Sequence, residues 1–131
     1  MLTGCRKYAA FKDNTEIANR HCPILVEQGI YISSISFNSL THKIYVTVSF
    51  DESLVNIDFA ALKSDSDYQM SMKRFLAQIL LASRSFRGIN NGMLQHDFNY
   101  EVELKGVVSE KSAELEFSPL LVQTLYNDIG L

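Results

Sequence analysis

The chain has 131 residues, and at this size one domain buries roughly two-thirds of its unfolded surface without support from disulfides or metals. Its hydrophobic content of 47% excludes a wholly disordered chain, and its net charge of −3 argues against nucleic acid as a main partner. No apolar run approaches the ~20 residues that a membrane-spanning helix requires.

The N-terminal segment is predicted to stand apart from the rest of the chain. Residues 1–13 show no clear periodicity, and we expect them to form a tether or leader ahead of a single domain over 14–131. Asn14 or Thr15 is suited to cap a short helix at the start of that domain. Pro23 disfavours helical geometry at the residue before it, so this helix is expected to end there.

Two strands and a hairpin loop are predicted next. The apolar alternation of residues 30–37 changes phase near Ser33 and Ser34, which indicates either a β-bulge or a strand that is buried on both faces. Residues 44–50 alternate regularly and predict a half-buried strand. The polar segment 38–42 between them has the length of a hairpin loop.

The middle of the chain is predicted to be helical, with a short turn or helix over 58–63 and a long amphipathic helix after it. Ser66 and Gln69 fit a capping box at the start of the long helix. Its apolar positions recur at helical spacing on one face: Tyr68, Met72, Phe75, Leu76, Ile79 and Leu80.

The end of this long helix is predicted at Gly88. Arg84 and Arg87 would complement the negative end of the helix dipole there. The following segment "INNGMLQ", residues 89–95, is rich in turn-forming residues and is predicted to be a loop.

Two more strands and a short helix complete the predicted fold. Residues 98–104 and 113–117 alternate between apolar and polar, mostly acidic, side chains and are joined by a turn over 106–112. Ser118 and Pro119 mark the start of a C-terminal helix. This order predicts an α+β fold: a four-stranded, mainly antiparallel sheet of two hairpins, with one long amphipathic helix and short terminal helices packed on one face.

The sequence contains no constellation that points to catalysis, a metal or a cofactor. His21, His42 and His96 lack the spacing of a zinc site, and no phosphate-binding loop, nucleophile elbow or Ser-His-Asp pattern occurs. The "SDSD" segment at 64–67 lacks the glycine of an EF-hand loop and is interpreted as a helix cap. We therefore predict a protein that is not an enzyme and that uses no cofactor or metal.

Five acidic residues share the predicted outer face of the second hairpin: Asp97, Glu101, Glu103, Glu114 and Glu116. Alternation places them on an open sheet face rather than in a dry cleft, so a solvated face is the default interpretation. The same face is a candidate docking surface for a basic partner, and an exposed strand edge is the other candidate surface.

The two cysteines, Cys5 and Cys22, are too few for a disulfide scaffold. They are suited either to pair with each other or to serve unrelated roles, with one chemically modified and the other a small buried apolar residue. The sequence leaves both interpretations open.

The segment "LTGC", Leu2 to Cys5, resembles a bacterial lipobox, in which a small residue precedes a cysteine that becomes lipidated at the new N-terminus. The resemblance implies that Cys5 carries acyl chains and that the residues after it hold the domain off a membrane. Arg6 stands where inner-membrane retention usually shows aspartate. That implies a location at the outer membrane, facing the periplasm.

The body of the chain resembles small uncharacterised bacterial envelope proteins, with Asn19 and the pair Cys22 and Pro23 before the first hairpin, then a helix and a second hairpin. We therefore predict a membrane-tethered periplasmic binding domain without catalysis, which contacts the membrane only through its lipid anchor. Its partner would be an unknown protein or envelope component. The alternative is a soluble cytoplasmic protein-binding module, inhibitor or immunity-like, that starts at Met1. The oligomeric state is not predicted.

Overall fold

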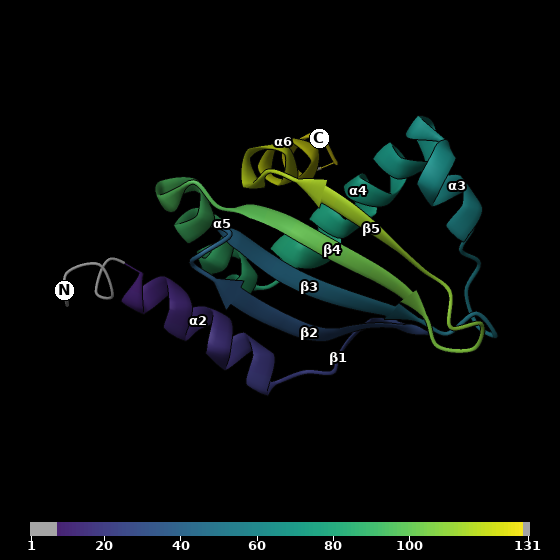
Figure 1. Ribbon diagram of the computed structural model, residues 1–131, viewed down its shortest axis with the longest axis horizontal. Helices are drawn as coiled ribbons and strands as arrows, with labels where there is room; N and C mark the ends of the chain where they lie inside the picture. Colours follow the sequence, from purple (N-terminus) through teal and green to yellow (C-terminus); the bar gives the residue numbers. More distant parts are fainter. Residues whose placement is uncertain (1–7, 130–131) are drawn as a thin grey trace.

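Residues 8–129 are described in the computed structural model of the chain, and they form helices and strands in the order α2, β1–β3, α3–α5, β4, β5 and α6 (Figure 1). The helices are α2 (Ala9–Arg20), α3 (Phe59–Ser64), α4 (Ser66–Leu81), α5 (Arg84–His96) and α6 (Pro119–Ile129). The strands are β1 (Ile24–Glu27), β2 (Ile30–Asn38), β3 (Lys43–Phe50), β4 (Asn99–Gly106) and β5 (Ser112–Phe117).

The strands form one five-stranded mixed sheet in the order β1-β2-β3-β4-β5. Neighbouring strands are antiparallel except β3 and β4, which run parallel with Lys43 opposite Asn99. The α+β class is as expected, but the prediction of four mainly antiparallel strands is wrong. The chain between β3 and β4 contains α3, α4 and α5. These helices bring the chain back to the end of the sheet at which β3 begins. β4 therefore starts beside the first residue of β3 and runs in the same direction.

β1 is the strand that the sequence did not predict. It has four residues, follows Pro23 directly, and carries an apolar run without alternation. Pairing with β2 places Ile24 opposite Ile32, which is fully buried, and Leu25 opposite Tyr31, which is exposed. So short a strand is defined by its partner rather than by its own pattern.

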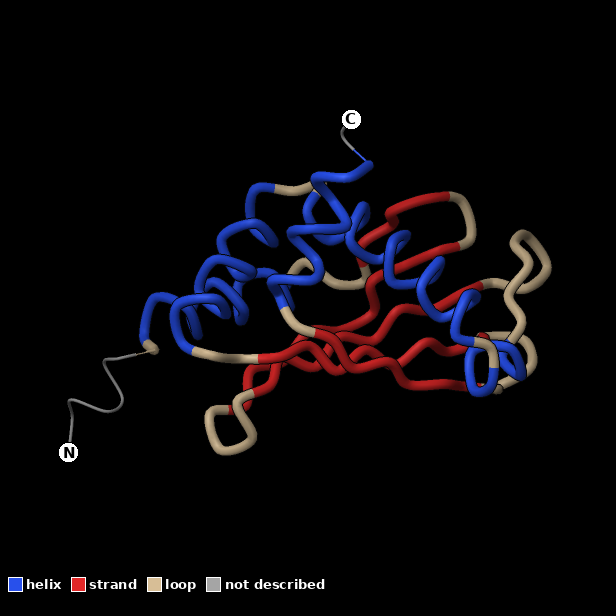
Figure 2. The backbone as a smooth tube through the Cα atoms, turned by 90° about the horizontal axis from the view of Figure 1, so that it is seen from above, coloured by secondary structure: helices blue, strands red, loops and turns tan. Residues whose placement is uncertain are grey.

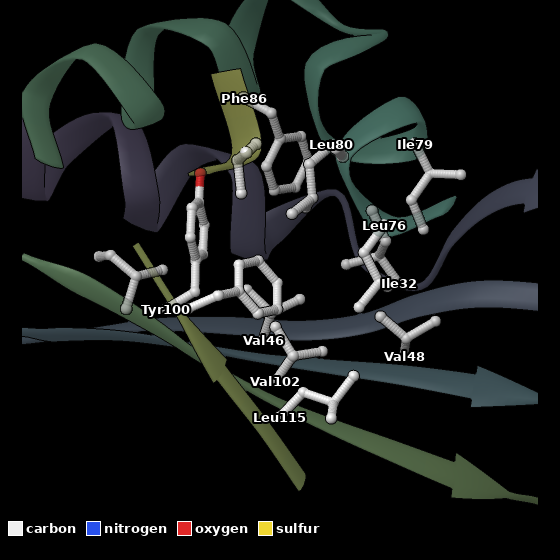
Figure 3. Packing of buried hydrophobic residues seen from close by; sticks show 14 of the residues in the cluster. Ile32, Val46, Val48, Leu76, Ile79, Leu80, Phe86, Tyr100, Val102 and Leu115 are labelled. Atoms are coloured by element: carbon white, nitrogen blue, oxygen red, sulfur yellow. The ribbon is translucent and has the colours of Figure 1, made fainter. Parts of the chain in front are cut away.

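The helices and the sheet form two layers with the core between them. Most of the helical segments lie on one side of the strands (Figure 2), and the buried side chains of the strands point to that side (Figure 3). On the opposite face Tyr45, Thr47, Glu101 and Glu103 are half-buried at most, so that face is open to water.

Several predicted features are confirmed. The register of β2 against β3 shifts between Ile32 and Ser34, so the change of phase is a β-bulge. α6 begins at Pro119, and the Ser118 hydroxyl accepts a hydrogen bond from the Leu121 N–H at 3.1 Å. The short helix expected over 58–63 is α3.

Helix α2 begins earlier than predicted, at Ala9 rather than at Asn14 or Thr15. Its buried positions are Phe11, Thr15 and Ala18. The buried threonine interrupts the apolar pattern, so the sequence shows no helical period over the first turns of α2. The Thr15 hydroxyl donates to the Phe11 carbonyl oxygen at 2.9 Å. Residues 9–13 are therefore part of the folded domain, while residues 1–7 of the predicted tether lie outside the described residues.

The predicted long helix is two helices, and the predicted loop 89–95 is wrong. α4 ends at Leu81, and the Ser83 hydroxyl caps α5 by accepting a hydrogen bond from the Phe86 N–H at 3.2 Å. Two of the turn-forming residues of α5 make close contacts with other elements: Asn90 with Tyr100 of β4, and Gly92 with Phe11 of α2. A Cβ atom at Gly92 would stand 2.8 Å from Cδ1 of Phe11, so only glycine lets α2 and α5 approach.

The predicted ends of the long helix are also corrected. Asp65, rather than Ser66, caps α4, and its carboxylate accepts hydrogen bonds from two backbone N–H groups of the first turn. Arg84 and Arg87 lie in the first turn of α5, at the positive end of a helix, so the dipole explanation for them is wrong. Arg87 instead donates to the Leu81 carbonyl oxygen at 3.4 Å.

A buried polar network joins three elements across the core. The Tyr100 hydroxyl of β4 donates to Asn90 Oδ1 of α5 at 2.7 Å, and Asn90 Nδ2 donates to the Pro119 carbonyl oxygen at 3.3 Å. Both side chains are fully buried, and burial raises the pKa of the Tyr100 hydroxyl. Tyr100 stands from the sheet toward the helices (Figure 3), so the network holds α5 and α6 over the sheet.

We expect Tyr100→Phe to lower the free energy of unfolding by about 1–3 kcal/mol, because it leaves Asn90 Oδ1 buried without a donor. Urea unfolding followed by circular dichroism measures the change. Tyr45→Phe is the matched control, since it removes a hydroxyl whose bond to Thr41 Oγ1 is exposed, and should cost less than about 0.5 kcal/mol. Equal losses in the two variants would contradict a role for the buried network.

Candidate functional site

An apolar groove opens at the β1 end of the sheet, and we call it the β1 groove. It lies between β1 and β2 on one side and the junction of α4 and α5 on the other, with the C-terminal end of α2 beside it. Its volume is about 670 Å³. Its apolar lining residues are Ala18, Pro23, Ile24, Leu25, Val26, Ile32, Ile79, Ala82 and Phe86.

Two local features keep the β1 groove open. β1 is short, and its inward side chains Ile24 and Val26 remain only half-buried. The break between α4 and α5 then separates the last turn of α4, which carries Ile79, from the first turn of α5, which carries Phe86. Figure 3 shows Ile79 and Phe86 on the helices and Ile32 on the sheet below them.

The chemistry of the β1 groove is that of a binding surface for apolar side chains. Its polar lining residues are His21, Gln78, Ser83 and Ser85, and no aspartate, glutamate, lysine or arginine lines it. The Ser83 hydroxyl is already engaged as the α5 cap. A concave apolar surface with a few polar groups is typical of sites that receive a ligand or a partner segment.

Four of the five predicted acidic residues lie together on the open face of the sheet. Glu101 stands opposite Glu116, and Glu103 stands opposite Glu114, across the pair β4 and β5. Lys43 Nζ lies 2.8 Å from Glu101 Oε1 and 3.5 Å from Glu116 Oε2, and the hydrogen bond to Glu101 raises the pKa of Lys43.

The fifth acidic residue, Asp97, does not belong to this face. It ends α5 in a left-handed conformation with φ 59°, before β4 begins. The regular alternation of the strand therefore begins only at Asn99, and the prediction that Asp97 shares the acidic face is wrong. Docking of a basic partner on the other four carboxylates stays a prediction.

The histidines do not form a site. His42 stacks on Phe98 with ring centroids 4.8 Å apart, and His96 stacks on Phe11 at 6.0 Å, at the end of the molecule where α2 begins. His21 lies at the rim of the β1 groove. Among residues 8–129, no cluster of three or more histidine, cysteine or acidic side chains is placed to hold a metal ion.

Of the two cysteines, Cys22 is the one within the described residues. Cys22 is half-buried, its thiol donates to the Ala18 carbonyl oxygen at 3.5 Å, and burial raises the pKa of the thiol. A raised pKa makes Cys22 a poor nucleophile at neutral pH. Cys5, with its predicted lipid attachment or pairing to Cys22, lies outside the described residues.

The β1 groove was missed by sequence reasoning. Two short features of the sequence belong to the groove. One is the apolar run at 24–26 after Pro23, and the other is Ser83, a helix cap inside an otherwise continuous helical pattern. Neither signal indicates by itself that the two segments face each other across an open space.

None of the helices in the described chain combines the length and the hydropathy needed to cross a membrane.

Comparison with known proteins gives a fold and no sequence family. No protein-family model and no curated sequence matches the chain. The pilotin EpsS of the Vibrio vulnificus type 2 secretion system is similar in structure, with a TM-score of 0.58 at 8% identity over 90% of this chain and 93% of that one.

Two further structures are similar to the same extent. The type II secretion system pilotin AspS from Vibrio cholerae gives a TM-score of 0.57 at 6% identity, over 88% of this chain and 91% of that one. A putative secreted protein from Pseudomonas aeruginosa gives 0.56 at 10% identity, over 90% and 94%. At such low identities the likeness shows a shared fold.

We expect Glu114→Lys to raise the free energy of unfolding by about 0.5 kcal/mol, because it replaces a like-charge pair opposite Glu103 with an attractive one. The same change at Glu116 should give no gain, since that carboxylate already pairs with Lys43. Urea unfolding of both variants checks this. A loss of stability in Glu114→Lys would show that Glu103 and Glu114 do not repel each other in the folded protein.

Proposed function

We propose that the chain is a non-catalytic binding domain of the bacterial cell envelope, and that its β1 groove receives one amphipathic segment of a partner protein. The groove is the observation that carries this proposal. It is apolar, uncharged and open along the edge of the sheet, whereas a site for a small polar ligand needs convergent polar groups.

The shape of the β1 groove favours a helix as the bound segment. A trough with a sheet edge as one wall and helix ends as the other accepts a helix whose apolar residues recur at i, i+3 or i+4, and i+7. Gln78 and Ser85 lie at its rim and are exposed, so they are available to the polar face of such a helix.

The proposed location rests on two independent observations. The lipobox-like "LTGC" supports an acylated Cys5. The fold is shared with pilotins of type 2 secretion systems, which supports a role in an envelope assembly. A fold by itself does not define a function, so the partner must be identified through the groove.

The anchor is tested by the intact mass of the protein, expressed in its own host from its natural upstream region. We expect Cys5 at the mature N-terminus with the added mass of acyl chains, and the protein in the membrane fraction. Cys5→Ser should abolish both. An unmodified soluble chain starting at Met1 would overturn the envelope location and favour the cytoplasmic binding module.

The groove is tested by site-specific photo-cross-linking in cells. A photoreactive residue at Gln78, on the groove rim, should cross-link to one partner segment with an amphipathic sequence, while the same residue at Gln95, far along α5, should not. Ala82→Arg should lower the yield at Gln78 at least about tenfold, since it brings a charge into an apolar site.

The matched control for Ala82→Arg is Ala60→Arg, the same change at an exposed alanine of α3 away from the groove. It should leave the cross-link at Gln78 unchanged. Identical adducts from Gln78 and Gln95, or an adduct that survives Ala82→Arg, would refute binding in the β1 groove.

A further inference from the structure

We propose that the end of the molecule formed by the start of α2 and the β2–β3 hairpin contacts a lipid surface, with Leu40 entering the headgroup region. We call this end the hairpin end. The inference rests on the proposed acylation of Cys5, and it assigns a second surface, separate from the β1 groove, whose partner is the membrane itself.

The first step is the length of chain between the lipid and the fold. Three residue steps separate Cys5 from Tyr8, so even a fully extended segment spans at most about 11 Å. Tyr8 already belongs to the folded body, since its ring lies 5.1 Å from His96, 5.4 Å from Phe98 and 5.9 Å from Phe37. Acyl chains on Cys5 would therefore hold the domain against the headgroups.

The second step is what the fold presents at that end. The β2–β3 hairpin and the start of α2 lie at the same end of the molecule (Figure 1), and both contribute rings to one aromatic cluster. Leu40, at the tip of the hairpin, is 94% exposed. Asn38 Oδ1 accepts hydrogen bonds from the N–H groups of Leu40 and Thr41 at 2.9 and 3.1 Å, so the turn holds the apolar tip outward.

Charge contributes little to the proposed lipid contact of the hairpin end. The first turn of α2 contains no acidic residue, so no carboxylate in that turn would repel lipid phosphates. Among the described residues near the start of α2, Lys12 is basic, Asp13 and Asp97 are acidic, and Lys12 Nζ lies 3.9 Å from Glu16 Oε1. These charges give no surplus of positive charge, so the acyl chains and Leu40 would supply the affinity for the lipid surface.

The geometry also separates the two surfaces. The β1 groove adjoins the C-terminal end of α2, and a helix of 12 residues is about 18 Å long. With the hairpin end on the membrane, the groove stays clear of the headgroups and open to a partner in the aqueous phase.

The chain contains no tryptophan, so a single introduced indole reports its own surroundings. The full chain with Cys22→Ser would be coupled through Cys5 to a maleimide lipid in vesicles of phosphatidylethanolamine and phosphatidylglycerol with brominated acyl chains. We expect Leu40→Trp emission to shift to shorter wavelength and to lose roughly half its intensity, because an interfacial side chain enters the acyl boundary.

Leu54→Trp is the matched control, since Leu54 is also exposed, at 54%, but lies in the turn after β3, at the far end of the sheet. Its emission should not change on coupling. Unchanged emission of Leu40→Trp, or equal quenching of the two variants, would overturn the proposal.

Chemical coupling separates this inference from the proposed anchor. If Cys5 is not acylated in the host but the coupled Leu40→Trp chain is quenched, the lipid affinity of the hairpin end holds and the envelope location fails. If Cys5 is acylated in the host but the coupled chain is not quenched, the envelope location holds and the hairpin end is not a lipid surface.

Discussion

The break between α4 and α5 at Ser83 is the constraint on which the rest of the structure depends. One continuous helix over 66–96 would be about 46 Å long, beyond the roughly 30 Å that the nine-residue β2 spans. The break redirects α5, so that Asn90 lies over Tyr100 and Gly92 meets α2. It also leaves an open space between the β1 end of the sheet and the junction of α4 and α5.

That space is the β1 groove, an apolar gap between sheet and helices that the chain does not fill. The strand at this edge of the sheet, β1, has only four residues, and its side chains Ile24 and Val26 are half-buried. Burying apolar surface is worth roughly 25 cal/mol per Å², so a partner segment that covers the groove gains affinity from surface that folding left exposed. The acidic face offers no comparable gain, because its carboxylates are polar groups that are partly or fully exposed, and two of them pair with Lys43.

The shared fold, the β1 groove and the segment around Cys5 bear on different parts of the proposed function. Likeness to pilotins fixes the fold and leaves the function to the site. The β1 groove supports binding of a protein segment, and the segment around Cys5 supports an anchor at the opposite end of α2. The two proposed surfaces are compatible, since the β1 groove lies at the other end of α2 from the surface proposed to face a membrane.

The sequence by itself determined the elements whose pattern is local: the change of phase in β2, both hairpins, the apolar face of α4 and the start of α6 at Pro119. Period and cap residues specify these without reference to the rest of the fold. Only the tertiary structure decided the parallel pairing of β3 with β4, the strand β1, the helical state of residues 89–95 and the β1 groove. Each of these depends on contacts between segments distant in sequence. β1 is a strand because it pairs with β2, and the turn-forming residues of α5 include Gly92, against which Phe11 of α2 packs.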